Sequence, residues 1–350
     1  MHKRQSWNNL KIWIDILTPK QLVFFEPLIK KLNKKHELLC TSRDYGEATK
    51  LAKIRKSDLV IVGKFGGGGK AGKLNASLNR MNSLFKIIQK FKPDLTLSFC
   101  SPEASRISFG LGIKHVAYTD SPHAEAAMKL TLPLIQKLLI PWVIPKKEFV
   151  RFGIEPRNIT TYKAIDAALT IKRKSEKKNI KFKKPNKKRI LIRMEESQSA
   201  YVSKSDKIIP IIKKIIDGFS EENIIILARY SEQIRELKKL FGNKSQIFDM
   251  SYDGKFLLEN VDVFVGSGGT MTAESALLGV PTISYTASPN LIEKFLAKKN
   301  LIKIEENPQK IVKIIKRYIR SPDDGIKKRA KSLLESMDDP HSKLFEIIKL

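Results

Sequence analysis

Apolar and polar residues along this chain form a repeating pattern that predicts a strand followed by a helix. The segment 11–17 is apolar enough for a buried strand. The segment 19–32 then repeats its apolar residues at the 3.6-residue spacing of an amphipathic helix. The same pattern predicts further strands at 37–41, 58–62, 94–99 and 114–119, with helices near 44–54 and 74–90. Alternating strands and helices indicate an α/β protein with parallel sheets covered by helices.

A second series of the same kind begins near residue 188. Its strands are expected at 189–194, 223–228, 246–248, 261–265 and 282–285. Between the two series, the Lys-rich segment 171–187 has few apolar residues, and we interpret it as a linker. The predicted domains are therefore 11–170 and 188–337, and a final helix at 338–350 could pack back on the first domain. The chain has 350 residues, which agrees with two hydrophobic cores.

The most informative motif is VDVFVGSGGTMTAESALLGVPTIS, at 261–284. It predicts a buried strand, a glycine turn and a helix that opens at Thr270. Such a turn exposes backbone N–H groups at the positive end of a helix dipole, which suits a phosphate. Gly268 and Gly269 permit close approach of a ligand. Thr270 could cap the helix or donate its hydroxyl, and Glu274, one turn later, could accept hydrogen bonds from ribose hydroxyls. The alternative is a strand–helix turn without a ligand.

The whole string resembles the nucleotide-diphosphate-sugar signature of GT-B enzymes, the UDP-GlcNAc 2-epimerases and the lipid-linked GlcNAc transferases. By that resemblance Ser267, Gly268, Gly269 and Thr270 would hold a diphosphate, and Glu274 the ribose. The resemblance also implies that loops after the first two strands of the second domain contact the donor. Arg193 and Arg229 follow these strands, and an arginine there could neutralise a phosphate in a bidentate manner.

A second resemblance covers 11–286 and is to an uncharacterised, mostly archaeal family known as DUF354, itself GT-B-like. It rests on IWIDILTPKQLVFFEPLI, TSRDY, KPDLTLSFCSPEASRISFGLG, YTDSPHA and the LPL…IPWVIP stretch. The resemblance implies two Rossmann-like domains whose parallel sheets face a central cleft. This chain departs from the family pattern at Lys20 and Gln21. The family pattern has Pro-Ala-His after the first strand, whereas this chain has Pro-Lys-Gln, and a base that such a His supplied would be missing here.

Three loops of the first domain carry candidate acceptor-side residues. Thr18 and Lys20 open the first helix, where Thr18 is expected as its cap and the backbone N–H groups could bind an acceptor. Asp120 and His123 follow the fifth strand and could form a catalytic base, or serve only as a cap and a surface imidazole. Glu103 and Arg106 follow the fourth strand. They could line the acceptor cleft or pair with one another, and a dipole-favourable Glu beside a surface Arg is the alternative.

Charge narrows the choice of partners. The net charge is +30, with 66 basic and 36 acidic residues. A Lys-rich solvated surface, an anionic membrane or substrate, and nucleic acid are the three interpretations. Nucleic acid is the least favoured, because no basic strand is interleaved with aromatic residues. The apolar segment 124–145 could dock on lipid headgroups, although an interior helix and strand is the favoured interpretation.

Other features exclude several function classes. No window of eighteen apolar residues predicts a membrane span, and the polar N-terminus has no signal-peptide core. The two cysteines, which form no CxxC or Cys/His cluster, are expected to be buried thiols. This use of cysteine is typical of the reducing cytoplasm. Peripheral attachment to the inner membrane face is the alternative location. The five histidines are scattered. No metal site and no cofactor beyond a nucleotide-sugar substrate are expected.

The leading hypothesis is a metal-independent GT-B glycosyltransferase that uses a nucleotide diphosphate sugar, expected to be UDP-linked, and an acceptor that the sequence does not identify. Asp120 or His123 would supply the base, and domain closure would be required. One alternative is a sugar-nucleotide epimerase or hydrolase. The epimerases carry His-Arg-Arg-Glu-Asn where this chain has Arg-Met-Glu-Glu-Ser after the first strand of the second domain, and the missing His counts against that chemistry. A non-catalytic basic binding protein is the other alternative.

Overall fold

The computed structural model describes residues 9–44, 58–175, 180–194, 208–228, 231–249, 253–286, 288–321 and 323–348. The chain divides into two compact units. Unit 1 comprises Met1–Asp166 and Asp338–Leu350, and unit 2 comprises Ala167–Met337. Most of the helix expected at 44–54 lies outside the described residues. Among the described helices, none combines the length and apolar character needed to cross a membrane.

Unit 1 is built on a parallel sheet in the strand order β3-β2-β1-β4-β5-β6-β7. Neighbouring strands pair in parallel throughout, as the strand–helix alternation predicts. The strands are β1 (Lys11–Ile16), β2 (Glu37–Asp44), β3 (Val60–Lys64), β4 (Leu95–Ser98), β5 (Lys114–Tyr118), β6 (Lys137–Pro141) and β7 (Ile159–Tyr162).

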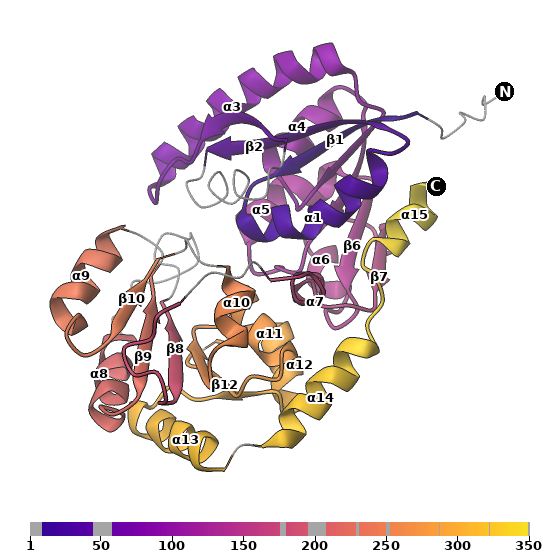
Figure 1. Cartoon of the computed structure of the whole chain (residues 1–350). Helices are drawn as coiled ribbons and strands as arrows, with labels where there is room; N and C mark the ends of the chain where they lie inside the picture. Colours follow the sequence, from indigo (N-terminus) through magenta and orange to yellow (C-terminus); the bar gives the residue numbers. More distant parts are fainter. Residues whose placement is uncertain are drawn as a thin grey trace. The chain divides into compact units, whose positions relative to one another are not determined.

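Helices cover both faces of this sheet (Figure 1). On one face α1 packs with α15, where the Phe24 ring meets His341 edge to face at 4.8 Å. On the other face α3 and α4 pack over Trp13 of β1 in a common apolar cluster. The helical segments of unit 1 are α1 (Pro19–Leu32), α3 (Lys70–Phe91), α4 (Pro102–Gly110), α5 (Glu125–Thr131), η1 (Leu132–Leu134), α6 (Lys147–Val150), η2 (Pro156–Asn158) and α15 (Ser342–Ile348).

A buried ion pair joins the helices of unit 1 to its central strand. Arg80 of α3 forms two hydrogen bonds to the carboxylate of Asp15 on β1, at 2.6 and 3.1 Å, and a third to the carbonyl of Val62 on β3 at 3.0 Å. The hydroxyls of Thr41 and Ser101 donate to the same carboxylate. Both charged side chains are almost fully buried, so the pair is stable only because nearly every polar atom has a partner.

Unit 2 contains a second parallel sheet in the order β10-β9-β8-β11-β12-β13. Alternate residues of its central strand face opposite cores: Ile190 and Ile192 pack with α8 and α13, and Leu191 packs with α10. The strands are β8 (Arg189–Arg193), β9 (Asn223–Leu227), β10 (Gln246–Phe248), β11 (Val263–Gly266), β12 (Thr282–Ser284) and β13 (Ile302–Ile304). The helices are α7 (Ala167–Lys172), α8 (Ile208–Gly218), α9 (Ser231–Phe241), α10 (Gly254–Glu259), α11 (Thr270–Leu277), α12 (Leu291–Lys298), α13 (Pro308–Arg320) and α14 (Asp324–Glu335).

Several elements were not expected from the sequence. The strands β7 and β13 are short, at four and three residues, and β7 contains the polar pair Thr160-Thr161, so its apolar alternation is weak. The strand β6 lies in the segment 124–145, where an interior helix and strand were expected. Residues 171–175 and 180–187 fall inside unit 2. There the guanidinium of Arg173 forms a bidentate pair with Asp253, the residue that caps α10.

Removal of one partner of the buried pair should strongly destabilise unit 1. We expect Arg80→Met to lower the free energy of unfolding by about 3–5 kcal/mol, because Asp15 would keep a buried charge without its cation. The exposed Lys11–Glu37 pair is the control, and Lys11→Met should cost at most about 1 kcal/mol. All three tryptophans of the sequence fall in unit 1, so urea unfolding followed by tryptophan fluorescence reports on this unit. Equal losses in both variants would contradict a structural role for the pair.

Candidate functional site

The candidate sites lie where the strand order of each sheet reverses. In unit 2 the chain builds β8, β9 and β10 outward and then returns to place β11 on the other side of β8. In unit 1 the same reversal separates β1 from β4. The loops that follow the two central strands then lead away in opposite directions, and this leaves space for a ligand beyond the carboxyl ends of the strands.

In unit 2 this position is occupied by the glycine turn. Gly268 and Gly269 have φ of +92° and +78°, a left-handed conformation that favours glycine. Gly269 is the N-cap of α11, and no side chain caps the helix. Thr270 is therefore the first helical residue, and the expectation that it could be the cap is wrong. The N–H groups of the first turn are left available to an anion, and Ser267 and Thr270 are partly accessible beside them.

A buried carboxylate lies directly against this turn. A Cβ atom added at Gly268 would lie 2.6 Å from both carboxylate oxygens of Glu293, so only glycine fits there without displacing that side chain. Glu293 accepts hydrogen bonds from the Ser284 hydroxyl at 2.7 Å and from the Asn290 N–H at 3.1 Å. It forms a capping box with Asn290 at the start of α12. Burial raises the pKa of Glu293 above its usual value. Nothing in the sequence pattern distinguished Glu293 beforehand.

The other residues predicted to bind the donor have different environments. Glu274 is in α11 and its side chain is buried. Arg193 ends β8 beside the point of reversal, but its guanidinium donates to the carbonyls of Leu227 and Ala228 at 3.3 and 3.4 Å, at the end of β9. Arg229 lies outside the described residues.

In unit 1 a lysine and two aspartates come together. Lys20, in the first turn of α1, places its Nζ 2.5 Å from Asp120 and 2.9 Å from Asp166. Asp120 follows β5, and Asp166 lies beyond β7 and accepts a hydrogen bond from the Tyr162 hydroxyl at 2.5 Å. A cation near a helix N-terminus opposes the helix dipole, and the two carboxylates compensate for it. We name Lys20, Asp120, Tyr162 and Asp166 the lysine cluster. Asp166 and Tyr162 were not predicted, since nothing in the pattern near 159–166 distinguishes them from a short strand and its turn.

The lysine cluster separates the proton affinities of its two carboxyl groups. Burial would lower the pKa of Lys20, but Asp120 and Asp166 raise it above its usual value. Burial acts in the opposite direction on Asp120, whose pKa is nevertheless held below its usual value by Lys20. Burial raises the pKa of Asp166 to about 6, and the neighbouring Asp120 adds to this effect. The folded protein therefore binds a proton at Asp166 more tightly than the unfolded chain, and this group lowers stability as pH rises from about 4 to 6.

His123 lies at the edge of the lysine cluster, three residues after Asp120. Its side chain is exposed. Loss of hydration lowers the pKa of His123 below its usual value, in spite of the opposing field of Asp120, and so its imidazole is neutral at neutral pH. The α5 helix begins later, with Ala124 as its N-cap and no side-chain cap bond. Neither Asp120 nor Ser121 therefore acts as the helix cap, which was the alternative to a functional role.

The remaining acceptor-side candidates do not join the lysine cluster. Thr18 caps α1 as predicted, accepting a hydrogen bond from the Gln21 N–H at 3.4 Å. Glu103 is buried beside Arg80 and accepts a hydrogen bond from the Ser77 hydroxyl at 2.8 Å. Arg106 is exposed and does not pair with Glu103, so the expected Glu103–Arg106 pair is wrong. Within the described residues, no group of three potential ligand side chains could hold a metal ion.

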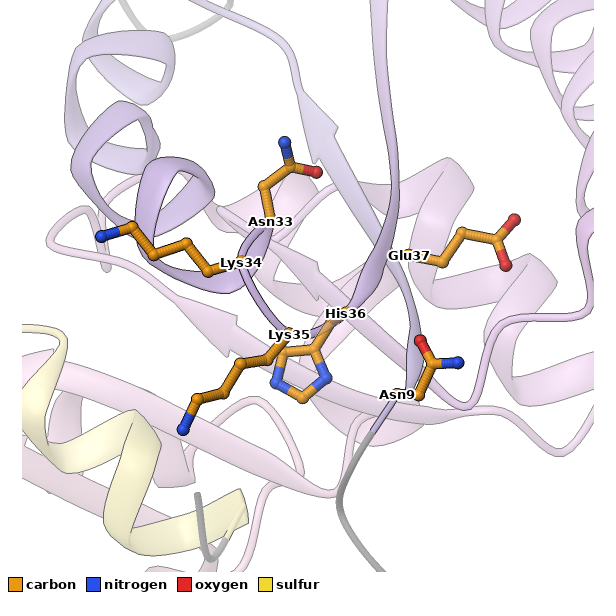
Figure 2. A pocket seen from close by; sticks show the side chains of 6 residues that line it. All are labelled: Asn9, Asn33, Lys34, Lys35, His36 and Glu37. Carbon is orange, nitrogen blue, oxygen red and sulfur yellow. The ribbon is translucent and has the colours of Figure 1, made fainter.

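A shallow hollow at the opposite edge of the first sheet is a weaker candidate. It is lined by Asn9, Asn33, Lys34, Lys35, His36 and Glu37. Figure 2 shows these side chains spread apart, with the side chains of the two lysines diverging from the loop. The imidazole of His36 accepts a hydrogen bond from the Leu10 N–H at 3.2 Å and so serves the local backbone. The polar groups that line the hollow do not converge on a common point. The hollow also lies at the amino ends of the strands, away from the reversal point.

The large apolar side chains of the segment 124–145 are mostly interior. Met128 of α5, Leu132 and residues 138–141 of β6 are buried, whereas Leu130 is exposed, at 59%. The favoured interpretation, an interior helix and strand, is confirmed, and the segment is not an exposed lipid-docking patch. Cys40 and Cys100 are buried free thiols, as predicted, and burial raises the pKa of Cys40 to about 12.

The fold is that of GT-B proteins. The structure is similar to that of the UDP-GlcNAc 2-epimerase from Neisseria meningitidis bound to UDP-GlcNAc, with 14% identity, a TM-score of 0.76 and coverage of 97% of this chain and 100% of that one. It is also similar to the spinosyn rhamnosyltransferase SpnG complexed with spinosyn aglycone, with 13% identity, a TM-score of 0.64 and coverage of 97% and 99%.

Residues 10–349 match the family described as "Protein of unknown function (DUF354)", and the chain belongs to this family. An uncharacterized protein of Methanocaldococcus jannaschii is 30% identical over 352 residues, which cover 97% of each chain. The similarity to this relative covers nearly the whole chain, but it assigns no reaction to the protein.

Removal of the cation should raise the proton affinity of both aspartates. In Lys20→Met we expect the pKa of Asp120 to rise and that of Asp166 to move above about 6, because Lys20 lowers both. Carbon-13 titration of the side-chain carboxyl groups measures each shift directly. Lys30→Met on the same helix is the matched control, since Lys30 is exposed and its partner among the described residues is the neighbouring Glu26. Unchanged titration of both aspartates in Lys20→Met would contradict the arrangement.

The contact between Glu293 and Gly268 should appear as a coupling energy. Gly268→Ala alone must displace the carboxylate, whereas in a Glu293→Ala background the added methyl group has room. We expect the double variant to be more stable than the sum of the single effects by about 1 kcal/mol or more. Amide hydrogen exchange in α11 and α12 measures the local free energy of opening. Glu335→Ala, at an exposed position of the same unit, is the control and should give additive effects.

Proposed function

We propose that this protein is a glycosyltransferase that uses a nucleotide diphosphate sugar, with UDP as the expected nucleotide. The observation that carries the proposal is the glycine turn at the reversal point of unit 2. It combines two left-handed glycines, a helix start without a side-chain cap and a position at the carboxyl end of a central strand. These features together suit a diphosphate better than they suit a purely structural turn.

In this proposal unit 2 binds the donor. The N–H groups of Thr270 and the residues after it would donate hydrogen bonds to the diphosphate, and the hydroxyl of Ser267 would add a further donor. As the sugar is transferred, negative charge develops on the departing diphosphate. The dipole of α11 is already oriented, so it would stabilise that charge without any rearrangement of the protein. Stabilisation of charge that develops in the transition state accelerates the reaction. Glu274 would hold the ribose, as the signature implies.

Unit 1 would supply the group that activates the acceptor. Of the two predicted catalytic residues, Asp120 is a weak base because its ion pair with Lys20 lowers its proton affinity. His123 is exposed and neutral at neutral pH, and a neutral imidazole has the proton affinity to act as a base toward an acceptor hydroxyl. Asp120 would then stabilise the imidazolium that forms, since its field favours the charged ring. We therefore assign the role of base to His123 and a supporting role to Asp120.

A sugar-nucleotide epimerase or hydrolase would use the same donor site, and product analysis distinguishes it from a transferase. The protein is incubated with UDP-GlcNAc alone, and the products are separated by chromatography. An epimerase yields a different UDP-sugar without an acceptor. A hydrolase yields UDP and free sugar in equal amounts. A transferase leaves nearly all of the UDP-sugar unchanged until an acceptor is added. Conversion to an epimer would overturn the transferase assignment but not the donor site.

Binding of nucleotide should depend on the glycine turn. We expect UDP or a UDP-sugar at about 100 times its Kd to add about 2.7 kcal/mol to the stability of unit 2, and so to raise its melting temperature by about 5 °C or more. Gly268→Ala and Glu274→Ala should lose most of this rise. Gly67→Ala is the matched control, because Gly67 has a similar φ of +73° in unit 1 with open space around it.

The control separates loss of a ligand site from general strain. A substitution at Gly67 carries the same left-handed penalty, so it should lower the melting temperature without changing the nucleotide-induced rise. A full nucleotide response in Gly268→Ala, or no response of the unmodified chain to any nucleotide or nucleotide sugar, would exclude the proposed donor site.

A further inference from the structure

The longest helix of unit 1 has an exposed apolar surface that the proposed chemistry does not use. On α3, Leu74, Leu78 and Phe85 are 63%, 48% and 42% exposed, and Met81 between them is half-buried. Their spacing of four, three and four residues places them in one line along the helix, over roughly 16 Å. We name this line the α3 stripe. Single exposed apolar side chains are common, but a continuous line of them indicates a contact surface.

The α3 stripe is separate from the side of α3 that packs on the protein. The helix is anchored by Arg80, Leu84 and Ile88, which are buried against the sheet and α4. The stripe lies roughly a quarter turn around the helix from this buried side. Two further exposed apolar residues, Phe109 and Leu111, lie at the end of α4, a helix that packs on α3, with 52% and 40% exposure.

The charged residues of α3 itself are all of one sign. The sequence of α3, KAGKLNASLNRMNSLFKIIQKF, contains no acidic residue. Lys70, Lys86 and Lys90 are exposed, and none of the three forms an ion pair with any residue that the structure describes. Two copies of this helix placed face to face would bring lysines together without a carboxylate to pair with them. The surface thus suits a partner that is both apolar and negatively charged.

A comparison with α13 shows that basic character alone does not produce this surface. The sequence of α13, PQKIVKIIKRYIR, is also rich in lysine and arginine and lacks acidic residues. However, its apolar side chains are used within the fold: Ile311 and Ile315 are buried, and Val312, Ile314, Tyr318 and Ile319 pack against the same core. In α3 the apolar stripe is left over after the core contacts are made.

We propose that the α3 stripe is a docking surface for a membrane that contains anionic lipids. Leu74, Leu78 and Phe85 would enter the boundary between headgroups and acyl chains, and the lysines of α3 would face the lipid phosphates. The helix would lie in the plane of the membrane and would not span it. This relocates the anionic-membrane contact considered from the sequence, from the interior segment 124–145 to the surface of α3. The inference does not depend on the proposed glycosyl transfer.

Co-sedimentation of the full chain with vesicles tests the proposal. Vesicles of phosphatidylcholine alone are compared with vesicles in which about a third of the lipid is phosphatidylglycerol. We expect binding only to the anionic vesicles, and we expect Leu74→Gln/Leu78→Gln/Phe85→Gln to weaken it at least about tenfold. The control Leu240→Gln/Ile304→Gln changes exposed apolar residues of unit 2 and should bind as the unmodified chain does. Circular dichroism verifies that each variant is folded.

A second pair of variants separates local charge from overall charge. Lys70→Gln/Lys86→Gln/Lys90→Gln removes three charges from α3, and Lys303→Gln/Lys313→Gln/Lys316→Gln removes three exposed lysines from unit 2. Only the α3 variant should lose most of its vesicle binding. Equal losses in both variants would mean non-specific attraction of a basic protein and would overturn the proposal. It would also be overturned by absence of binding, by full binding of the stripe variant, or by a dimer that the stripe variant dissociates.

Discussion

An all-parallel sheet delivers every strand end to the same edge, and this constraint organises the chemistry of both units. Each strand of the two sheets runs in the same direction as its neighbours, so that the residues following the strands must gather along one edge. Lys20, Asp120 and Asp166 come from parts of the sequence as far apart as 146 positions, yet they meet because they follow β1, β5 and β7. The glycine turn occupies the equivalent place after β11. Strand order, more than distance along the sequence, therefore decides which residues come together at this edge of the sheet.

The two units handle charge at this edge in different ways. Unit 1 compensates its buried charges internally: Arg80 is matched by Asp15, and Lys20 is matched by two carboxylates. In unit 2 the first turn of α11 has no side-chain cap, and the carboxylate of Glu293 lies against Gly268 of the glycine turn. A second negative group near a bound diphosphate would be unfavourable if it were ionised. The burial that raises the pKa of Glu293, and its hydrogen bonds to Ser284 and Asn290, reduce this conflict while fixing the shape of the turn.

The sequence pattern was sufficient to predict those helices and strands that depend on neighbouring residues. The first helix was predicted at 19–32, and it forms at Pro19–Leu32 because Thr18 caps it and Pro19 fits its first position. The helix start after Gly269 was predicted for the same kind of reason. Contacts across long separations were not predictable. The pairing of Arg80 with Asp15 spans 65 positions, and Asp166 follows a strand, β7, whose polar threonines weaken its pattern. The sequence held no signal for Glu293, because its contact with Gly268 exists only in the folded unit.

The position at which the family pattern has a histidine lies next to Lys20. In the pattern Pro-Ala-His the histidine aligns with Gln21, and Lys20 takes the place of the alanine. The side-chain oxygen of Gln21 accepts a hydrogen bond from the Leu17 N–H at 2.7 Å, so this side chain serves the backbone at the start of α1. Lys20 instead places a cation between Asp120 and Asp166, and it remains charged because both carboxylates raise its pKa. A base that the family histidine supplied would therefore have to come from another side chain, and the exposed His123 lies three residues after Asp120.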